Sequence, residues 1–156
     1  MVGYARQMSD TPKTLFLADD EATAVLGRRL AAALRPGDLV RLEGDLGAGK
    51  TALARVVIRA LTGDPALDVP SPTFALVQPY DAAGRSVLHA DLYRIGGERE
   101  VDELGLFDSP DAIVLVEWAE RSREVVERAT ATVRLAIPRD GVGRTAEVGF
   151  IDGRSY

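Results

Sequence analysis

Apolar and polar residues follow two spacings along this chain, and the alternation between them predicts an α/β order of elements. Residues 14–18 form a short apolar run typical of a strand. The next stretch has apolar residues at helical spacing, which predicts a helix capped at Asp19 or Asp20 and ended by Pro36 and Gly37. The apolar face of this helix consists of Ala22, Val25, Leu26, Leu30 and Ala33.

The pattern then predicts a strand over residues 38–43, a glycine-rich loop and a helix over residues 52–61. Residues 63–72 include three prolines and indicate a loop. Two further strands, at 73–80 and 86–93, are separated by a turn at 81–84. Such a hairpin makes its strands antiparallel, so we expect a mixed sheet.

The last third of the chain predicts the remaining elements of an α/β sheet. Five apolar residues at 112–116 are typical of a buried central strand, and a short helix is expected before them at 98–104. The other expected elements are a helix at 119–128 and strands at 130–137 and 144–151, joined by an exposed turn at 139–143. Together these elements predict one α/β domain, a P-loop NTPase fold with a mixed, partly antiparallel sheet flanked by helices. We assign it residues 13–156 and expect residues 1–12 to be a flexible leader.

The composition of the chain excludes several classes of protein. The chain has 156 residues, of which 46% are hydrophobic, as in ordinary globular domains. It has no cysteine, which excludes disulfides and thiolate metal sites. A secretory signal and a long apolar span are both missing from the sequence, so we expect a cytoplasmic protein that does not bind membranes. The net charge of −5 argues against independent binding to a nucleic-acid backbone.

The glycine-rich segment matches the complete P-loop pattern and lies between a predicted strand and a predicted helix. Its residues are Gly44, Asp45, Leu46, Gly47, Ala48, Gly49, Lys50 and Thr51. Glycines let the backbone curl around phosphates, and the following helix directs its N-terminal amides at the same anion. The pattern therefore predicts binding of ATP or ADP, with Lys50 on the β- and γ-phosphates and Thr51 on Mg²⁺.

Hydrolysis of ATP also needs a carboxylate at the end of a neighbouring strand. Glu117 follows the apolar run directly and is the better candidate for a Mg²⁺ ligand, which leaves Asp91 to orient or polarise the attacking water. Two other interpretations stay open, a salt bridge from Asp91 to Arg94 and a place for Glu117 beside a helix N-cap. A period of two puts His89, Asp91 and Tyr93 on one strand face.

Two single residues are ambiguous on sequence grounds. His89 is the only histidine, and a lone histidine beside a strand carboxylate is more often structural than catalytic. Trp118, the only tryptophan, is a candidate to stack on the nucleotide base or on a partner, or simply to pack in the core. We expect adenine near the start of the first helix and the C-terminal strands.

Several segments together resemble the TsaE family, the small ATPases of bacterial threonylcarbamoyladenosine (t6A) synthesis on tRNA. The resemblance covers about residues 14–150. Its motifs are the P-loop of residues 44–51, Ser71-Pro72-Thr73-Phe74, His89-Ala90-Asp91-Leu92-Tyr93-Arg94, Glu103-Leu104-Gly105-Leu106, and Val116-Glu117-Trp118 with Glu120.

The resemblance implies a Mg²⁺-dependent ATPase that acts with the partners that form and transfer the threonylcarbamoyl group, in a complex with TsaB- and TsaD-type proteins. It implies that tRNA is contacted through these partners. Thr51 and Glu117 would hold Mg²⁺, Asp91 would assist hydrolysis, and Thr73 would sense the γ-phosphate. Turnover should be slow alone, because no arginine finger is evident in the sequence.

Two other functions use the same loop. A small-molecule kinase needs an arginine-rich lid, and the nearest cluster, at Arg121, Arg123 and Arg128, is typical of a solvated helix surface. A nucleotide-dependent interaction module would bind ATP without turnover.

Overall fold

The computed structural model describes residues 13–156, so the predicted leader at residues 1–12 lies outside the described part of the chain. The elements in chain order are β1 (Lys13–Leu17), α2 (Asp20–Ala33), β2 (Leu39–Glu43), α3 (Lys50–Thr62), β3 (Val77–Ala82), β4 (Arg85–Asp91), α4 (Glu98–Glu103), β5 (Ile113–Glu117), the 3₁₀ helix η1 (Ala119–Arg121), α5 (Arg123–Arg128), β6 (Ala131–Ala136) and β7 (Arg144–Phe150).

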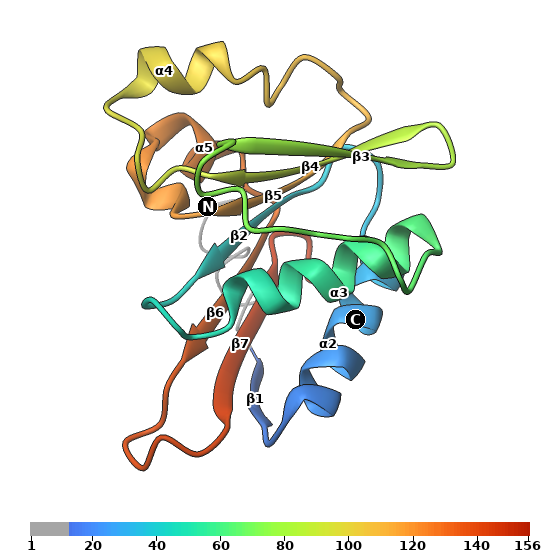
Figure 1. The fold of residues 1–156 in the computed structure, drawn as a ribbon, viewed down its shortest axis with the longest axis vertical. Helices are drawn as coiled ribbons and strands as arrows, with labels where there is room; N and C mark the ends of the chain where they lie inside the picture. Colours follow the sequence, from blue (N-terminus) through green and yellow to red (C-terminus); the bar gives the residue numbers. More distant parts are fainter. Residues whose placement is uncertain (1–12) are drawn as a thin grey trace.

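All strands within residues 13–156 join one seven-stranded sheet in the order β1-β7-β6-β2-β5-β4-β3 (Figure 1). The central strands β6, β2, β5 and β4 are mutually parallel, whereas β3, β7 and β1 pair antiparallel to their neighbours. The predicted mixed sheet is therefore confirmed. β5 is buried along its whole length between β2 and β4, as its apolar run predicts.

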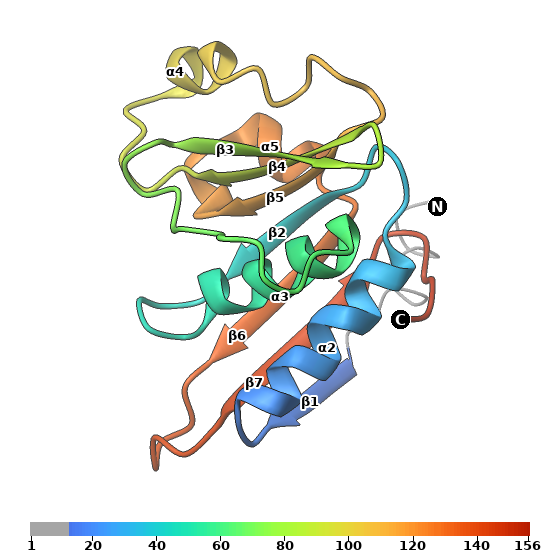
Figure 2. The same ribbon diagram turned by 45° about the vertical axis from the view of Figure 1, so that its right-hand side comes forward.

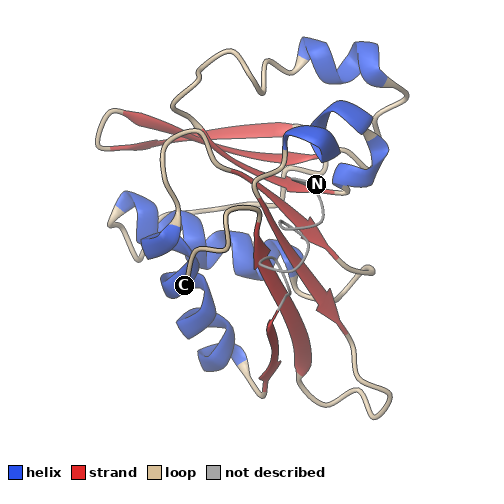
Figure 3. Cartoon of the chain, turned by 180° about the vertical axis from the view of Figure 1, so that it is seen from behind, coloured by secondary structure: helices blue, strands red, loops and turns tan. Residues whose placement is uncertain are grey.

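Helices cover the sheet unequally. α2 and α3 lie on one face (Figure 2), over a core that includes Leu42, Leu53 and Leu115. On the other face α4 and α5 pack against β4 and β5 through Val101 and Val125. Viewed from that side, no described helix crosses β6 and β7 (Figure 3). The carboxyl ends of the parallel strands lie beside α3.

Three predicted boundaries are wrong for local reasons. The strand expected from residue 73 begins at Val77, because Leu76 donates its amide to the Pro72 carbonyl (2.7 Å) and closes a turn. β4 ends at Asp91, whose carboxylate accepts the amide of Tyr93 (2.8 Å). Tyr93 therefore does not share the strand face of His89 and Asp91.

The third wrong boundary is the helix expected over residues 119–128. It is split at Ser122, which is extended (φ −133°) and caps α5 by accepting the amide of Val125 at 3.2 Å. A serine that can bond the backbone locally favours a cap over a helix interior. At the first helix the predicted cap is confirmed as Asp19, which accepts the amide of Ala22 at 2.9 Å.

Candidate functional site

The glycine-rich loop connects β2 to α3 at the carboxyl edge of the parallel strands. Gly44, Gly47 and Gly49 all have positive φ angles, of 146°, 82° and 105°. Gly44 also lies against β6, where a Cβ atom would stand 2.5 Å from the Leu135 carbonyl oxygen. Glycine is thus required at position 44 by both conformation and space.

Helix α3 begins at Lys50 with Gly49 as its N-cap and no side-chain cap. Its first-turn amides are therefore open toward the loop, as in anion sites at helix N-termini. The aliphatic and charged parts of Lys50 are buried, with the side chain folded back so that Nζ donates to the Gly44 carbonyl.

The ammonium of Lys50 also lies 3.7 Å from the centre of the Trp118 ring. Burial lowers the pKa of Lys50 below its ordinary value, although the nearby carboxylates of Glu117, Glu120 and Asp91 counteract part of this effect. A cation held without a fully charged partner in direct contact is well suited to receive phosphate.

Glu117 stands at the end of β5 and is 3% exposed. Its two carboxylate oxygens lie 3.0 Å and 2.9 Å from the Thr51 hydroxyl, in the first turn of α3. Glu117 directly precedes Trp118, the N-cap residue of the following 3₁₀ helix, but its carboxylate contacts Thr51 and His89. The structure therefore brings together the two residues predicted as Mg²⁺ ligands.

Asp91 ends the neighbouring strand β4, directly paired in register with Glu117. It is 5% exposed, and its second oxygen lies 3.4 Å from the Thr73 hydroxyl. Thr73 in turn contacts the Ser71 hydroxyl at 2.8 Å. In the described chain Asp91 makes no ion pair with Arg94, whose guanidinium lies 5.2 Å from the Phe74 ring centre.

The donor set fits a hard divalent cation that is completed by phosphate. No group of three or more His, Asp or Glu side chains among residues 13–156 is arranged to hold a metal by itself. Mg²⁺ usually takes one or two protein oxygens and fills its other positions with water and phosphate oxygens. The hydroxyl of Thr51 and the carboxylate of Glu117 meet that requirement.

A hollow of about 260 Å³ adjoins the other side of the loop. It is lined by the start of α2, the loop glycines and the C-terminal strands, including Asp19, Thr23, Gly49, Leu135 and Arg144. This is the place where the sequence predicts adenine. Trp118 does not line this hollow, since its ring packs beside Lys50 and 4.9 Å from the Tyr93 ring.

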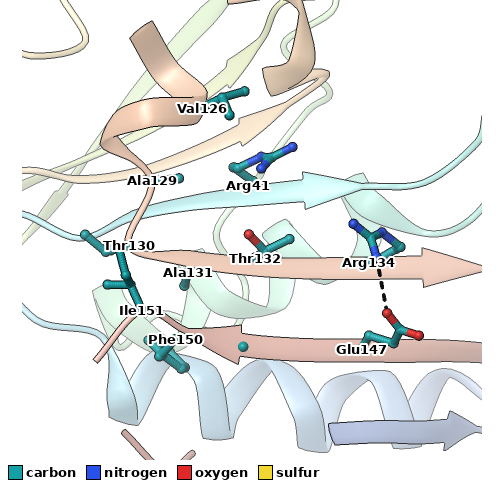
Figure 4. A pocket seen from close by; sticks show the side chains of 11 residues that line it. Arg41, Val126, Ala129, Thr130, Ala131, Thr132, Arg134, Glu147, Phe150 and Ile151 are labelled. Carbon is teal, nitrogen blue, oxygen red and sulfur yellow. Dashed lines mark hydrogen bonds and ion pairs between the residues drawn. The ribbon is translucent and has the colours of Figure 1, made fainter. Parts of the chain in front are cut away.

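Another hollow, of about 310 Å³, lies beside α5, where no described helix crosses β6 and β7 (Figure 4). Its charged residues neutralise one another, because Arg134 pairs with Glu43 (2.9 Å) and Glu147 (3.3 Å), and Arg41 pairs with Glu43. None of the predicted site residues lines it. Its polarity is that of a solvated sheet face.

Sequence reasoning missed Arg144, which donates to the Gly47 carbonyl at 3.1 Å and so braces the glycine loop from β7. The only local signal is its place after the glycine-rich turn at 139–143, which the pattern indicates as merely exposed. A contact between residues 97 positions apart leaves no trace in local spacing.

Similarity to known proteins shows the family of this chain. Residues 17–146 match the family described as threonylcarbamoyl adenosine biosynthesis protein TsaE. The chain belongs to the TsaE family. TsaE proteins take part in tRNA threonylcarbamoyladenosine biosynthesis, so the resemblance seen in the sequence is confirmed.

Two TsaE relatives show how far the similarity extends. The chain is 44% identical to TsaE of Streptomyces coelicolor over 78% of this chain and 82% of that protein. It is 36% identical to TsaE of Rickettsia felis over 79% of this chain and 72% of that protein.

The fold matches a solved structure as well. The crystal structure of Bacillus subtilis YdiB superposes with a TM-score of 0.70 and 26% identity, covering 91% of this chain and 87% of YdiB. The predicted single-domain P-loop NTPase fold is thus confirmed. No helix among residues 13–156 has the length and apolar character needed to cross a bilayer.

Proposed function

We propose that this TsaE family member is a Mg²⁺-dependent ATPase that converts ATP to ADP and phosphate and is required for t6A modification at position 37 of tRNA. It would act in the cytoplasm with TsaB- and TsaD-type proteins, which hold the tRNA. The observation that carries the proposal is the contact of Thr51 with Glu117 at 2.9 Å, because it unites the first turn of α3 with a buried strand-end carboxylate.

Phosphate binding is assigned to the loop and the first turn of α3. The amides of residues 44–51 would surround the β-phosphate, and Arg144 supports this curve by bonding the Gly47 carbonyl. Lys50 would leave the Gly44 carbonyl for the β- and γ-phosphates, since an ionised oxygen is a stronger acceptor than a neutral one.

Hydrolysis is assigned to the two strand-end carboxylates. Thr51 and Glu117 would hold Mg²⁺, which when bound neutralises charge developing on the phosphate oxygens. Asp91 keeps one oxygen on the Tyr93 amide, so the carboxylate is fixed while its other oxygen faces the hydroxyl of Thr73. From this place Asp91 would orient and polarise the attacking water, and Thr73 would respond to the γ-phosphate.

We expect slow turnover of the free protein because the arginines around the site are already engaged, Arg144 with the Gly47 carbonyl and two others with aromatic rings. Arg94 stands over the ring of Phe74 and Arg121 over the ring of Tyr93, at 5.2 Å and 5.1 Å. Phe74 is 85% exposed and Tyr93 44% exposed. This surface of exposed aromatic rings and arginines beside the glycine loop has the composition of a protein interface core, which supports stimulation by a partner.

The proposal is tested by ATP turnover of the purified protein with and without the TsaB- and TsaD-type proteins of the same bacterium. Asp91→Asn keeps the acceptor for the Tyr93 amide but removes the charge. We expect it to lower turnover by about 100-fold or more while ADP affinity stays within about twofold.

The same reconstitution, with tRNA, threonine, bicarbonate, ATP and the other enzymes of the pathway, should lose multi-turnover t6A formation in Lys50→Ala. Undiminished t6A formation would remove the pathway role. Phosphate appearing on a small acceptor would instead indicate a kinase, and tight ATP binding without turnover would indicate an interaction module.

A further inference from the structure

His89 is a residue to which neither the predicted mechanism nor the phosphate loop gives a role. It is the only histidine of the chain, and its side chain is completely buried. Its Nε2 atom lies 2.7 Å from Oε2 of Glu117. This is the contact of a strong, charge-assisted hydrogen bond.

The sheet places His89 beneath the site. β4 and β5 run parallel with His89 opposite Leu115 and Asp91 opposite Glu117, so His89 stands one step below the strand ends. Leu115 belongs to the core on the α3 side, and the side chain of Glu117 meets Thr51 on that same side. Glu117 is therefore held by Thr51 from α3 and by His89 from below.

The imidazole tautomer follows from its surroundings. Nδ1 is buried and has no hydrogen-bond partner within the described chain. A proton on that atom would have no acceptor, whereas a proton on Nε2 is donated to a carboxylate. His89 therefore donates through Nε2.

We propose that His89 is a positioning residue for the Mg²⁺ site, which fixes the carboxylate of Glu117 by donating to Oε2 from inside the sheet. The inference rests on the proposed function, since it assigns Glu117 to the metal. Rotation about the last torsion of a glutamate is nearly free, so two oxygens on a strand end have no set direction by themselves. With Oε2 held by His89, the carboxylate has a defined direction toward the Thr51 hydroxyl, beside which Mg²⁺ would bind.

Removal of such an outer partner commonly lowers metal affinity by about 10- to 100-fold. The affinity for nucleotide without metal should not change, because His89 lies below the carboxylate and does not line the glycine loop. This combination separates positioning from a general effect on the fold.

Two variants of similar size test the donor. His89→Gln can offer an amide N–H near the place of Nε2, whereas His89→Leu fills the space without a donor. The chosen readout is Mn²⁺ binding in the presence of ADP, followed by the electron paramagnetic resonance of free Mn²⁺, which requires no turnover. We expect about 10- to 100-fold weaker Mn²⁺ binding in His89→Leu and less than about threefold weakening in His89→Gln. ADP binding in EDTA should be equal in all three proteins.

Equal Mn²⁺ affinity in the wild type and His89→Leu would overturn the inference, as would equal losses in both variants. If His89→Leu fails to fold, His89→Asn replaces it, because its shorter amide cannot reach Glu117 from the strand. A wild type that binds Mn²⁺ with ADP but does not hydrolyse ATP would contradict the proposed ATPase and leave the role of His89 measurable. A wild type in which ADP does not promote Mn²⁺ binding would overturn both.

Discussion

The surroundings of Lys50 favour the binding of an anion to its ammonium group. Its ammonium is buried, bonded to the Gly44 carbonyl and placed against the Trp118 ring. These neutral partners compensate only part of the lost hydration, which is why burial lowers the pKa of Lys50. A bound triphosphate would bring several negative charges to the same atom and raise that pKa again.

The affinity for a triphosphate should depend on pH through Lys50. Because the pKa of Lys50 is lowered in the free protein and raised by phosphate, binding takes up a proton once the pH exceeds the free value. Affinity for a non-hydrolysable ATP analogue should be constant below that pH and fall by up to about tenfold per unit above it. Titration calorimetry from neutral to alkaline pH measures this fall.

Lys50→Arg is the matched control, since a guanidinium keeps its proton throughout this range. Its analogue affinity should show a flatter dependence on pH. A parallel decline in both proteins would assign the effect to other groups.

The site residues that could be predicted from the sequence are those that belong to a continuous motif or end a predicted strand. The loop residues, Lys50 and Thr51 are recognisable because the P-loop is continuous in the chain. Glu117 and Asp91 are identifiable because each ends an apolar strand. The brace from Arg144 and the contact between Lys50 and Trp118 are not predictable, because they depend on how distant elements pack.

Among the elements, the contact between α2 and α3 depends on Gly27. A Cβ atom at this position would stand 2.4 Å from Cγ1 of Val56 on α3. Glycine inside a helix costs about 1 kcal/mol relative to alanine. Gly27 therefore weakens α2 locally and permits the close approach that covers the sheet.

At Gly27, helix propensity favours alanine whereas the close packing against Val56 favours glycine. Gly27→Ala should destabilise the protein by about 1–3 kcal/mol, despite the better helix propensity of alanine, because Val56 is branched and cannot turn away freely. Combining it with Val56→Ala removes the opposing methyl groups. The double variant should be more stable than the sum of the single changes predicts. Urea unfolding measures all four proteins, and a more stable Gly27→Ala would contradict the close packing.

The elements themselves were largely predictable, and their ends were not. Apolar periodicity located every strand and helix of the described chain, and the turn at 81–84 correctly implied an antiparallel hairpin. The failures at Leu76, Asp91 and Ser122 share a cause. At each of them a local hydrogen bond, to a carbonyl, a carboxylate or a hydroxyl, ends the regular backbone where hydrophobicity alone would continue it.

At the scale of the molecule, two exposed phenylalanines within residues 13–156 lie far apart in the sheet order. Phe74 is 85% exposed beside the proposed nucleotide site, and Phe16 is 59% exposed on the edge strand β1. The sheet order places β1 at one edge and β3, which follows the Phe74 segment, at the other. Of these two phenylalanines, Phe74 has an arginine over its ring and directly follows Thr73 in the chain.

Substitution of Phe74 and of Phe16 should have different effects on stimulation by the partners. Phe74→Ala should weaken stimulation of ATP turnover by the TsaB- and TsaD-type partners by about 30-fold, the loss typical of a hot-spot residue, while turnover of the free protein changes little. Phe16→Ala is the matched control and should leave stimulation unchanged. Turnover measured against partner concentration distinguishes them, and equal behaviour of the two variants would exclude Phe74 from the interface.

The close approach of Gly44 to Leu135 has a consequence for the order of synthesis. A ribosome completes the glycine loop early, but Glu117 follows Thr51 by 66 residues, and Leu135, against which the loop rests, follows later still. β2 itself gains its two neighbours only when β5 and β6 are made. A nascent chain that stops before β6 therefore carries the whole proposed phosphate-binding sequence without the surroundings that shape it, and nucleotide should not stabilise the chain before β6 has been made.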